Sequence, residues 1–263
     1  MSPSPVSAPI TVAIDGPSGS GKSSVSRAVA TALGLRYLDT GAMFRVLTLW
    51  RQRREVELTD RAAVRGEVER MPMLIGTDPE DPGVWLDDQR VDAHIRTAAI
   101  SAQVSHVATN PGVRTVLAAQ QRDLIEQARR DAGGIVVEGR DITTVIAPDA
   151  ECRILLSASE QARLDRRSAE LSARGDRAQA AAVHDQVVRR DRDDSTVSQF
   201  MTPASGVHGI DTSLLTFKES VAAVLAVVNA QGAAAESRTV DDNPTDHTTT
   251  ADTPHTPAGG ASR

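Results

Sequence analysis

The stretch IDGPSGSGKSS, Ile14–Ser24, constrains the fold of this chain more than any other feature of its sequence. It matches the pattern G-x-x-x-x-G-K-[ST] from Gly16 to Ser23, and a β-branched apolar run, Ile10–Ile14, comes directly before it. Apolar residues with helical spacing follow and stop at Gly34. A buried strand, a glycine-rich turn and a helix in this order predict a loop that binds phosphate groups.

The residue types in this loop explain its chemistry. Glycines let the backbone curl until successive N–H groups face one anion, and the helix that follows adds its positive N-terminal end. The Lys22 ammonium is expected to reach the β- and γ-phosphates of a nucleoside triphosphate, and the Ser23 hydroxyl to bind Mg²⁺. The motif alone is shared by GTPases, ATPases and small-molecule kinases, so it predicts the ligand and not the reaction.

The rest of the chain alternates between strand and helix patterns. Further buried strands are predicted within 35–41, 133–141, 151–159 and 207–211, and helices within 42–56, 112–130, 159–192 (interrupted at Gly175) and 213–231. Between them, residues 71–96 show short apolar segments separated by Asp, Pro and Gly turns, which predicts a small antiparallel insert. The pattern favours an α/β fold with a parallel sheet covered by helices on both faces.

Composition limits the setting and the partners. The chain has 263 residues, a net charge of −6, 2% aromatic residues and a single cysteine, Cys152. We therefore expect a protein of the cytoplasm, with neither a nucleic acid nor a membrane as its partner. Residues 1–9 are expected to form a flexible N-terminus, 10–230 one domain, and 231–263 a disordered tail rich in Thr, Pro, Asp and Ala.

Two classes of P-loop protein fit poorly. A GTPase needs the element N/T-K-x-D to read guanine, and lysine occurs only at positions 22 and 218. An ATPase machine needs an apolar strand that ends in Asp-Glu, whereas GIVVEGRD ends in Glu138-Gly-Arg140-Asp141. These charged residues follow a predicted parallel strand, and ligands bind at the carboxyl ends of such strands in open α/β sheets.

Several segments of the sequence together resemble one protein family. The segments IDGPSGSGKSSVSRAVATALGLRYLDTGAMFR, IRT, NPGVR, VVEGRD, APDA and RRDRDDST, in this order, resemble the bacterial cytidylate kinases, which are P-loop nucleoside monophosphate kinases. The resemblance runs from Thr11 to Val228. It implies a P-loop kinase core, a nucleoside-monophosphate-binding insert at about 60–105, a helical lid at about 159–192, and transfer of the γ-phosphoryl group of ATP to CMP or dCMP with Mg²⁺.

The resemblance also implies roles for individual residues. Arg45 and Arg140 match positions that bind the acceptor phosphate, while Ser105, Arg114 and Asp141 match positions that read cytosine, and Asp194 one that contacts the ribose. Thr40 and Arg190 match further positions around the acceptor. Catalytic residues would be Lys22, Arg140 and, from the lid, Arg163 and Arg167. The ATP-binding residues would be Gly16, Pro17, Ser18, Gly19, Ser20, Gly21, Lys22, Ser23 and Ser24, with Ser23 on the metal.

Physical chemistry supports these expectations. Phosphoryl transfer needs positioning and charge neutralisation, and bidentate arginines suit both tasks. Cytosine presents an N4 amino donor that Asp141 can accept, whereas uracil presents a carbonyl there and leaves the pair unmatched. We expect a monomer, because lid and insert need freedom to close.

Two departures from the family pattern leave alternatives open. Val197 stands where the family usually has an arginine, and this removes one cation from the acceptor or lid site. Thr143 and Ala147 stand where the family tends to have Gly and Phe. The chain is then a cytidylate kinase, another small-acceptor P-loop kinase, or a nucleotide-binding protein with weakened catalysis. The alternative for Arg45 is that it lies on a solvated face of its helix. The alternative for Arg140 and Asp141 is that they form a structural ion pair with no role in binding.

Overall fold

A five-stranded parallel sheet forms the centre of the computed structural model, which describes residues 9–173 and 185–241. Its strands run in the order β2-β6-β1-β7-β8. Their bounds are β1 (Ile10–Asp15), β2 (Arg36–Asp39), β6 (Gly134–Gly139), β7 (Cys152–Ser157) and β8 (His208–Asp211). Every residue of β1 and β6 is buried, as expected for the inner strands of a parallel sheet covered on both faces.

Alternating side chains of β1 divide the core of this sheet into two layers. Val12 and Ile14 pack with α1 (Lys22–Leu33) and with α9 (Phe217–Asp241) on one face. Ala13 packs on the other face with Ile125 of α5 (Pro111–Ala132) and with a π-helical turn, η2 (Ile142–Ile146). This period-2 pattern makes the short apolar run before the phosphate loop a strand that is buried on both sides.

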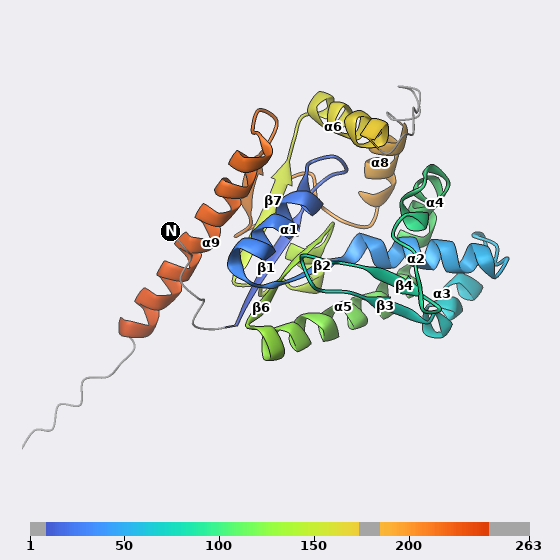
Figure 1. The fold of residues 1–263 in the computed structure, drawn as a ribbon, viewed down its shortest axis with the longest axis horizontal. Coiled ribbons are helices and arrows are strands. Elements are labelled where there is room, and N and C mark those ends of the chain that lie inside the picture. Colours follow the sequence, from blue (N-terminus) through green and yellow to red (C-terminus); the bar gives the residue numbers. More distant parts are fainter. Residues whose placement is uncertain (1–8, 174–184, 242–263) are drawn as a thin grey trace, which may run out of the picture.

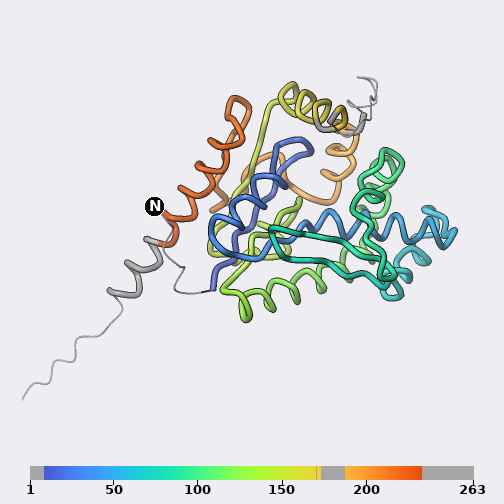
Figure 2. The backbone as a smooth tube through the Cα atoms, viewed as in Figure 1, coloured from blue at the N-terminus to red at the C-terminus, as the bar shows by residue number. Residues whose placement is uncertain are grey.

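Two further units project from the sheet (Figures 1 and 2). One contains α2 (Thr40–Arg53), α3 (Arg61–Arg70), the antiparallel strands β3 (Met73–Ile75), β4 (Val84–Leu86) and β5 (Gln89–Arg90), the 3₁₀ turn η1 (His94–Arg96) and α4 (Ala98–Ala108). The other contains α6 (Glu160–Ala173), the π-helical turn η3 (Asp185–Arg189) and α8 (Arg190–Asp194), above the sheet in Figure 1. Apolar side chains of the first unit, among them Leu47, Val68 and Leu86, form a core together with Leu117 of α5.

The predicted parallel sheet and the small antiparallel insert are confirmed. Some details differ from expectation. Helices α3 and α4 and the turns η1 and η2 were not predicted. Helix α9 continues to Asp241, through the first part of the segment expected to be a disordered tail. The interruption expected at Gly175 lies outside the described residues. No helix in the two described ranges is both long and apolar enough to cross a membrane.

Candidate active site

The phosphate loop joins β1 to α1 and has the backbone that its glycines permit. Gly19 and Gly21 have φ angles of 78° and 88°, in the left-handed region that favours glycine. A Cβ on Gly16 would lie 2.2 Å from the carbonyl oxygen of Leu156, so no side chain fits there without a backbone shift. The loop thus lies tightly against β7 and α6, and its curled backbone borders a cavity of about 950 Å³.

This cavity brings together residues from all three parts of the fold. Predicted site residues that line it are Ser18, Gly19, Ser20, Gly21, Lys22, Ser23, Ser24, Thr40, Arg45, Arg114, Arg140, Asp141, Arg167, Arg190 and Asp194. Four predicted residues are not among its lining: Gly16 and Pro17 at the base of the loop, Ser105 and Arg163. Predicted site residues from Ser18 to Asp194 therefore converge on one cavity.

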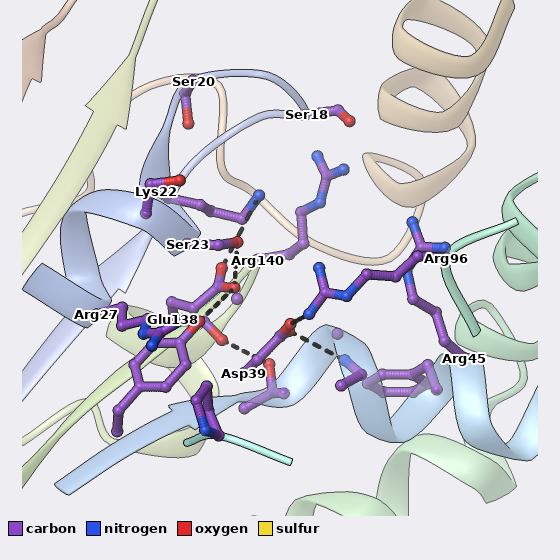
Figure 3. A pocket seen from close by; sticks show the side chains of 18 of the residues that line it. Ser18, Ser20, Lys22, Ser23, Arg27, Asp39, Arg45, Arg96, Glu138 and Arg140 are labelled. Carbon is purple, nitrogen blue, oxygen red and sulfur yellow. Dashed lines mark hydrogen bonds and ion pairs between the residues drawn. The ribbon is translucent and has the colours of Figure 1, made fainter. Parts of the chain in front are cut away.

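Glu138, at the end of β6, organises the loop side of the cavity (Figure 3). Its Oε1 accepts a hydrogen bond of 2.5 Å from the Ser23 hydroxyl, and its Oε2 lies 4.0 Å from the Lys22 ammonium. Burial, and next the carboxylate of Asp39, raise the pKa of Glu138 to about 7, against the lowering effect of Lys22. A buried carboxylate of this kind favours a nearby cation.

The side of the cavity next to α8 contains a cluster of buried charges. Arg140 donates a hydrogen bond of 2.5 Å to Asp191, and its Nε lies 3.4 Å from Asp194. The Arg190 Nε lies 3.6 Å from the same Asp194 oxygen. In the described part of the chain the other Asp194 oxygen, Oδ1, is buried without a hydrogen-bond partner, and so is the Nη2 of Arg140. Arg140, Arg190 and Asp194 all line the cavity, so this cluster of charges suits a polar ligand there.

Arg163 and Arg167 of α6 occupy different environments, although they were predicted together. The Arg163 side chain is only 6% exposed, donates to the Ser18 carbonyl oxygen at 3.1 Å and forms a short ion pair with Asp191. Asp191 in turn accepts a bond of 3.0 Å from the Ser18 N–H. Arg163 therefore holds the phosphate loop from behind, whereas Arg167 lines the cavity. The helical spacing of the two arginines did not indicate which face of α6 points to the cavity, so the sequence could not distinguish their roles.

A further ion pair lies where α5 meets the end of β6. The Arg114 Nη2 donates to Asp141 at 2.5 Å and to the Ser198 hydroxyl at 3.2 Å. Burial raises the pKa of Asp141, although Arg114 acts to lower it. Ser105, the third residue predicted there, is 4% exposed on α4.

Arg45 reaches the cavity from α2 and does not lie on a solvated helix face. Its Nη1 donates to the Ile95 carbonyl oxygen at 3.0 Å and to the Ser101 hydroxyl at 2.9 Å. Burial, then the nearby Arg190 and Arg96, hold the pKa of Arg45 well below its ordinary value. Both partners are neutral, so its positive charge remains available to an anion.

The two departures from the family pattern have distinct environments. Val197 lines the cavity with 37% of its surface exposed, so its apolar side chain forms part of the wall. Thr143 instead lies behind the site: its hydroxyl and its N–H donate to Asp15 at 2.7 and 2.8 Å, and the Ile142 N–H donates at 3.0 Å. Asp15 immediately precedes the phosphate loop, so Thr143 ties the end of β1 to the turn after Asp141.

Sequence reasoning missed several residues of the cavity, among them Glu138, Asp39, Arg96 and Arg166. The sequence places Glu138 with Arg140 and Asp141 at the carboxyl end of a strand, where ligands bind, but it assigns Glu138 no role of its own. Arg166 donates to the Ser20 carbonyl oxygen at 3.3 Å and to the Thr212 carbonyl oxygen at 2.5 Å. No local signal distinguished Arg166 from its neighbours in an arginine-rich helix.

A family model and curated relatives identify the same family. The model of the family described as cytidylate kinase matches residues 12–230. A curated cytidylate kinase of Nocardia farcinica is 49% identical over 225 residues, which cover 85% of this chain and 95% of that protein. One of Rhodococcus jostii is 47% identical over 222 residues, covering 84% and 95%. Among solved structures, a gluconokinase from Sinorhizobium meliloti aligns with a TM-score of 0.43 at 17% identity, covering 89% of this chain and 98% of that one.

Proposed function

The chain belongs to the cytidylate kinase family, and we infer that it transfers the γ-phosphoryl group of ATP to CMP or dCMP, giving ADP and CDP or dCDP. One observation carries this inference for the present chain. A single cavity holds both the phosphate loop and the Arg114–Asp141 pair, so a triphosphate donor and a cytosine nucleotide can bind facing each other.

The donor side is proposed to bind ATP through the loop from Gly16 to Ser24. Its backbone N–H groups and the N-terminal end of α1 attract the phosphate oxygens. Among the described residues, Lys22 approaches only Glu138 and the Pro17 carbonyl oxygen, at 4.0 and 3.5 Å, which leaves its ammonium able to turn toward the β- and γ-phosphates. Arg163 acts here as a positioning residue, because it contacts the Ser18 backbone and Asp191 instead of the cavity.

The residues beside the loop fit a magnesium ion. Ser23 and Glu138 supply a hydroxyl and a carboxylate oxygen 2.5 Å apart, and hard oxygen ligands are those that Mg²⁺ prefers. Bound Mg²⁺ would neutralise charge on the transferring phosphate oxygens. We propose that Ser23 binds the ion and that Glu138 orients its water ligands and balances its charge.

The acceptor side is proposed to read CMP by three kinds of contact. Asp141, held by Arg114, accepts from the cytosine N4 amino group. The unpartnered Oδ1 of Asp194 accepts from a ribose hydroxyl. Arg45, Arg140 and Arg190 surround the acceptor phosphate, with Thr40 nearby, and Arg167 approaches from the lid. Ser105 is proposed to contact the cytosine only after the insert moves, since it does not line the cavity here.

The reaction then needs no covalent intermediate. An oxygen of the CMP phosphate forms a bond to the γ-phosphorus as the bond to the β-phosphate oxygen breaks, and the arginines neutralise the charge that the two phosphates bring together. We further propose that the protein acts as a monomer in the cytoplasm and has no nucleic-acid partner, in line with its net charge of −6.

An ADP-coupled assay with ATP and Mg²⁺ tests the proposal, with CMP, dCMP, UMP, AMP and shikimate as parallel acceptors. We expect turnover that depends on CMP or dCMP and is at least ten-fold slower in kcat/KM with UMP, as follows from one unmatched buried group. Preference for another acceptor would reassign the substrate. Saturable ATP binding without acceptor-dependent turnover would indicate a binding protein instead.

A further inference from the structure

Arg96 is a cavity residue to which neither the sequence pattern nor the proposed function gives a role. It ends η1, in the insert, and its side chain is 36% exposed toward the cavity. Its Nη2 donates a hydrogen bond of 2.8 Å to Oδ2 of Asp39, at the end of β2 (Figure 3). Asp39 is itself fixed, because its Oδ1 accepts from the Ala42 N–H at 3.0 Å and caps α2.

The contact with Asp39 uses only part of the Arg96 guanidinium. Within the ranges that the structure describes, its other N–H groups donate to no protein acceptor. A guanidinium has five N–H donors in a rigid, planar arrangement. One edge of Arg96 is therefore directed by Asp39, and the remaining donors are available to a ligand in the cavity.

Arg45 lies directly beside Arg96. It donates to the carbonyl oxygen of Ile95, the residue before Arg96, and Figure 3 shows both side chains entering the same part of the cavity. Burial lowers the pKa of Arg45 most; Arg190, Arg96 and Arg167 lower it further, whereas Asp39 raises it. Positive charge thus exceeds negative charge around Arg45, and a bound anion would remove this repulsion.

We propose that Arg96 binds the phosphate of the acceptor nucleotide together with Arg45, and that Asp39 positions it to do so. This assignment rests on the proposed function. A phosphate monoester carries close to two negative charges at pH 7 and offers three oxygens, enough for two neighbouring guanidinium groups. Arg96 comes from the insert and Asp39 from the core, so the pair also places the insert correctly for the acceptor.

The test compares CMP with cytidine, which lacks only the phosphate. Dissociation constants of both ligands are measured by calorimetry for the wild type, Arg96→Gln and Arg96→Lys. The control is Arg65→Gln, which removes the same charge from an exposed, ion-paired arginine on α3 of the same insert. Thermal unfolding of each variant checks its folding, and Arg96→Lys keeps the charge next to Asp39 if the glutamine variant does not fold.

We expect Arg96→Gln to weaken CMP binding by about ten-fold or more, as for the loss of a charge-assisted hydrogen bond, and to change cytidine binding by less than about two-fold. Arg96→Lys should fall between the wild type and Arg96→Gln, since lysine keeps the charge but loses the planar donor array. Equal effects on both ligands, or no effect on either, would overturn the proposal. If the wild type turns over CMP but the Arg96 variants do not show this difference between CMP and cytidine, only the Arg96 assignment is refuted. If the wild type shows no CMP-dependent turnover, the proposed function itself is refuted.

Discussion

Replacing Glu138 with glutamine is expected to make the ligand-free protein more stable and the enzyme slower. The Glu138 carboxyl is buried beside Ser23 and Lys22, and its pKa rises from 4.5 to about 7 because burial disfavours the charged form. This value already includes the attraction of Lys22. Glutamine keeps the shape and the oxygen that accepts from Ser23, but it never ionises.

The sign and size of the stability effect follow from proton linkage. Because the folded state binds the Glu138 proton more tightly than the unfolded chain, the contribution of this carboxyl to stability is greatest below about pH 4.5 and declines until about pH 7. A difference of about 2.5 pKa units corresponds to about 3 kcal/mol at about 1.4 kcal/mol per unit. Glu138→Gln should therefore gain up to about 3 kcal/mol over the wild type at pH 8 and almost nothing at pH 4.5.

Thermal unfolding followed by circular dichroism, at several pH values from 4.5 to 8 and without nucleotide, measures this difference in stability between Glu138→Gln and the wild type. For a chain of this size each kcal/mol shifts Tm by about 2–4 °C. Glu69→Gln, at an exposed position of α3, serves as the charge control and should show no such gap. A Tm difference between Glu138→Gln and the wild type that stays constant with pH would refute the reasoning.

The activity of the same variant tests the proposed role in binding magnesium. Loss of a group that orients metal ligands typically costs about 10–100-fold in metal affinity or activity. We expect kcat/KM to fall by about this factor and the Mg²⁺ concentration for half-maximal rate to rise. A stabilised variant with an unchanged Mg²⁺ dependence would remove Glu138 from the metal site.

Three further substitutions probe other parts of the cavity. Asp141→Asn should reduce the CMP:UMP ratio of kcat/KM by at least about ten-fold, since it replaces the acceptor for the cytosine amino group; steady-state kinetics with both acceptors measure this, and an unchanged ratio would contradict it. Thr143→Val should lower the free energy of unfolding by about 1–2 kcal/mol in urea titrations, because Asp15 loses one buried hydrogen bond, while Thr143→Ser should stay close to the wild type. Val197→Arg should raise kcat/KM for CMP by about ten-fold or more, because it restores a cation that the family has in addition to Arg45 and Arg140, and unchanged kinetics would contradict this.

Local signals predicted the elements that position the phosphate loop. A strand buried on both faces, a glycine-rich turn and an amphipathic helix each have a sequence signature, and β1, the loop and α1 follow it closely. Helix α3 was missed, because its sequence RAAVRGEVER buries only Val64, Glu67 and Val68 and contains a glycine. Its position depends on packing against α5 and not on a strong helical pattern.

The site was predictable only where a motif marks it. The phosphate loop and the Arg140-Asp141 segment follow strands whose ends converge, so their place in the cavity could be expected. The roles of arginines on helices could not, because a period of 3.6 residues does not say which face meets the ligand: Arg163 packs behind the loop while Arg167 lines the cavity. Arg96 and Asp39 meet only in the folded chain, 57 positions apart, and no local pattern announces such a pair.

The central claim is that this cavity transfers a phosphoryl group from ATP to a cytidine monophosphate. Phosphorus NMR of a mixture of the protein, ATP, Mg²⁺ and CMP tests it most directly, because the method identifies each product. The account predicts that CDP and ADP appear in equal amounts, and that ATP stays intact when CMP is omitted. ATP converted to ADP and inorganic phosphate while CMP stays unchanged would contradict it.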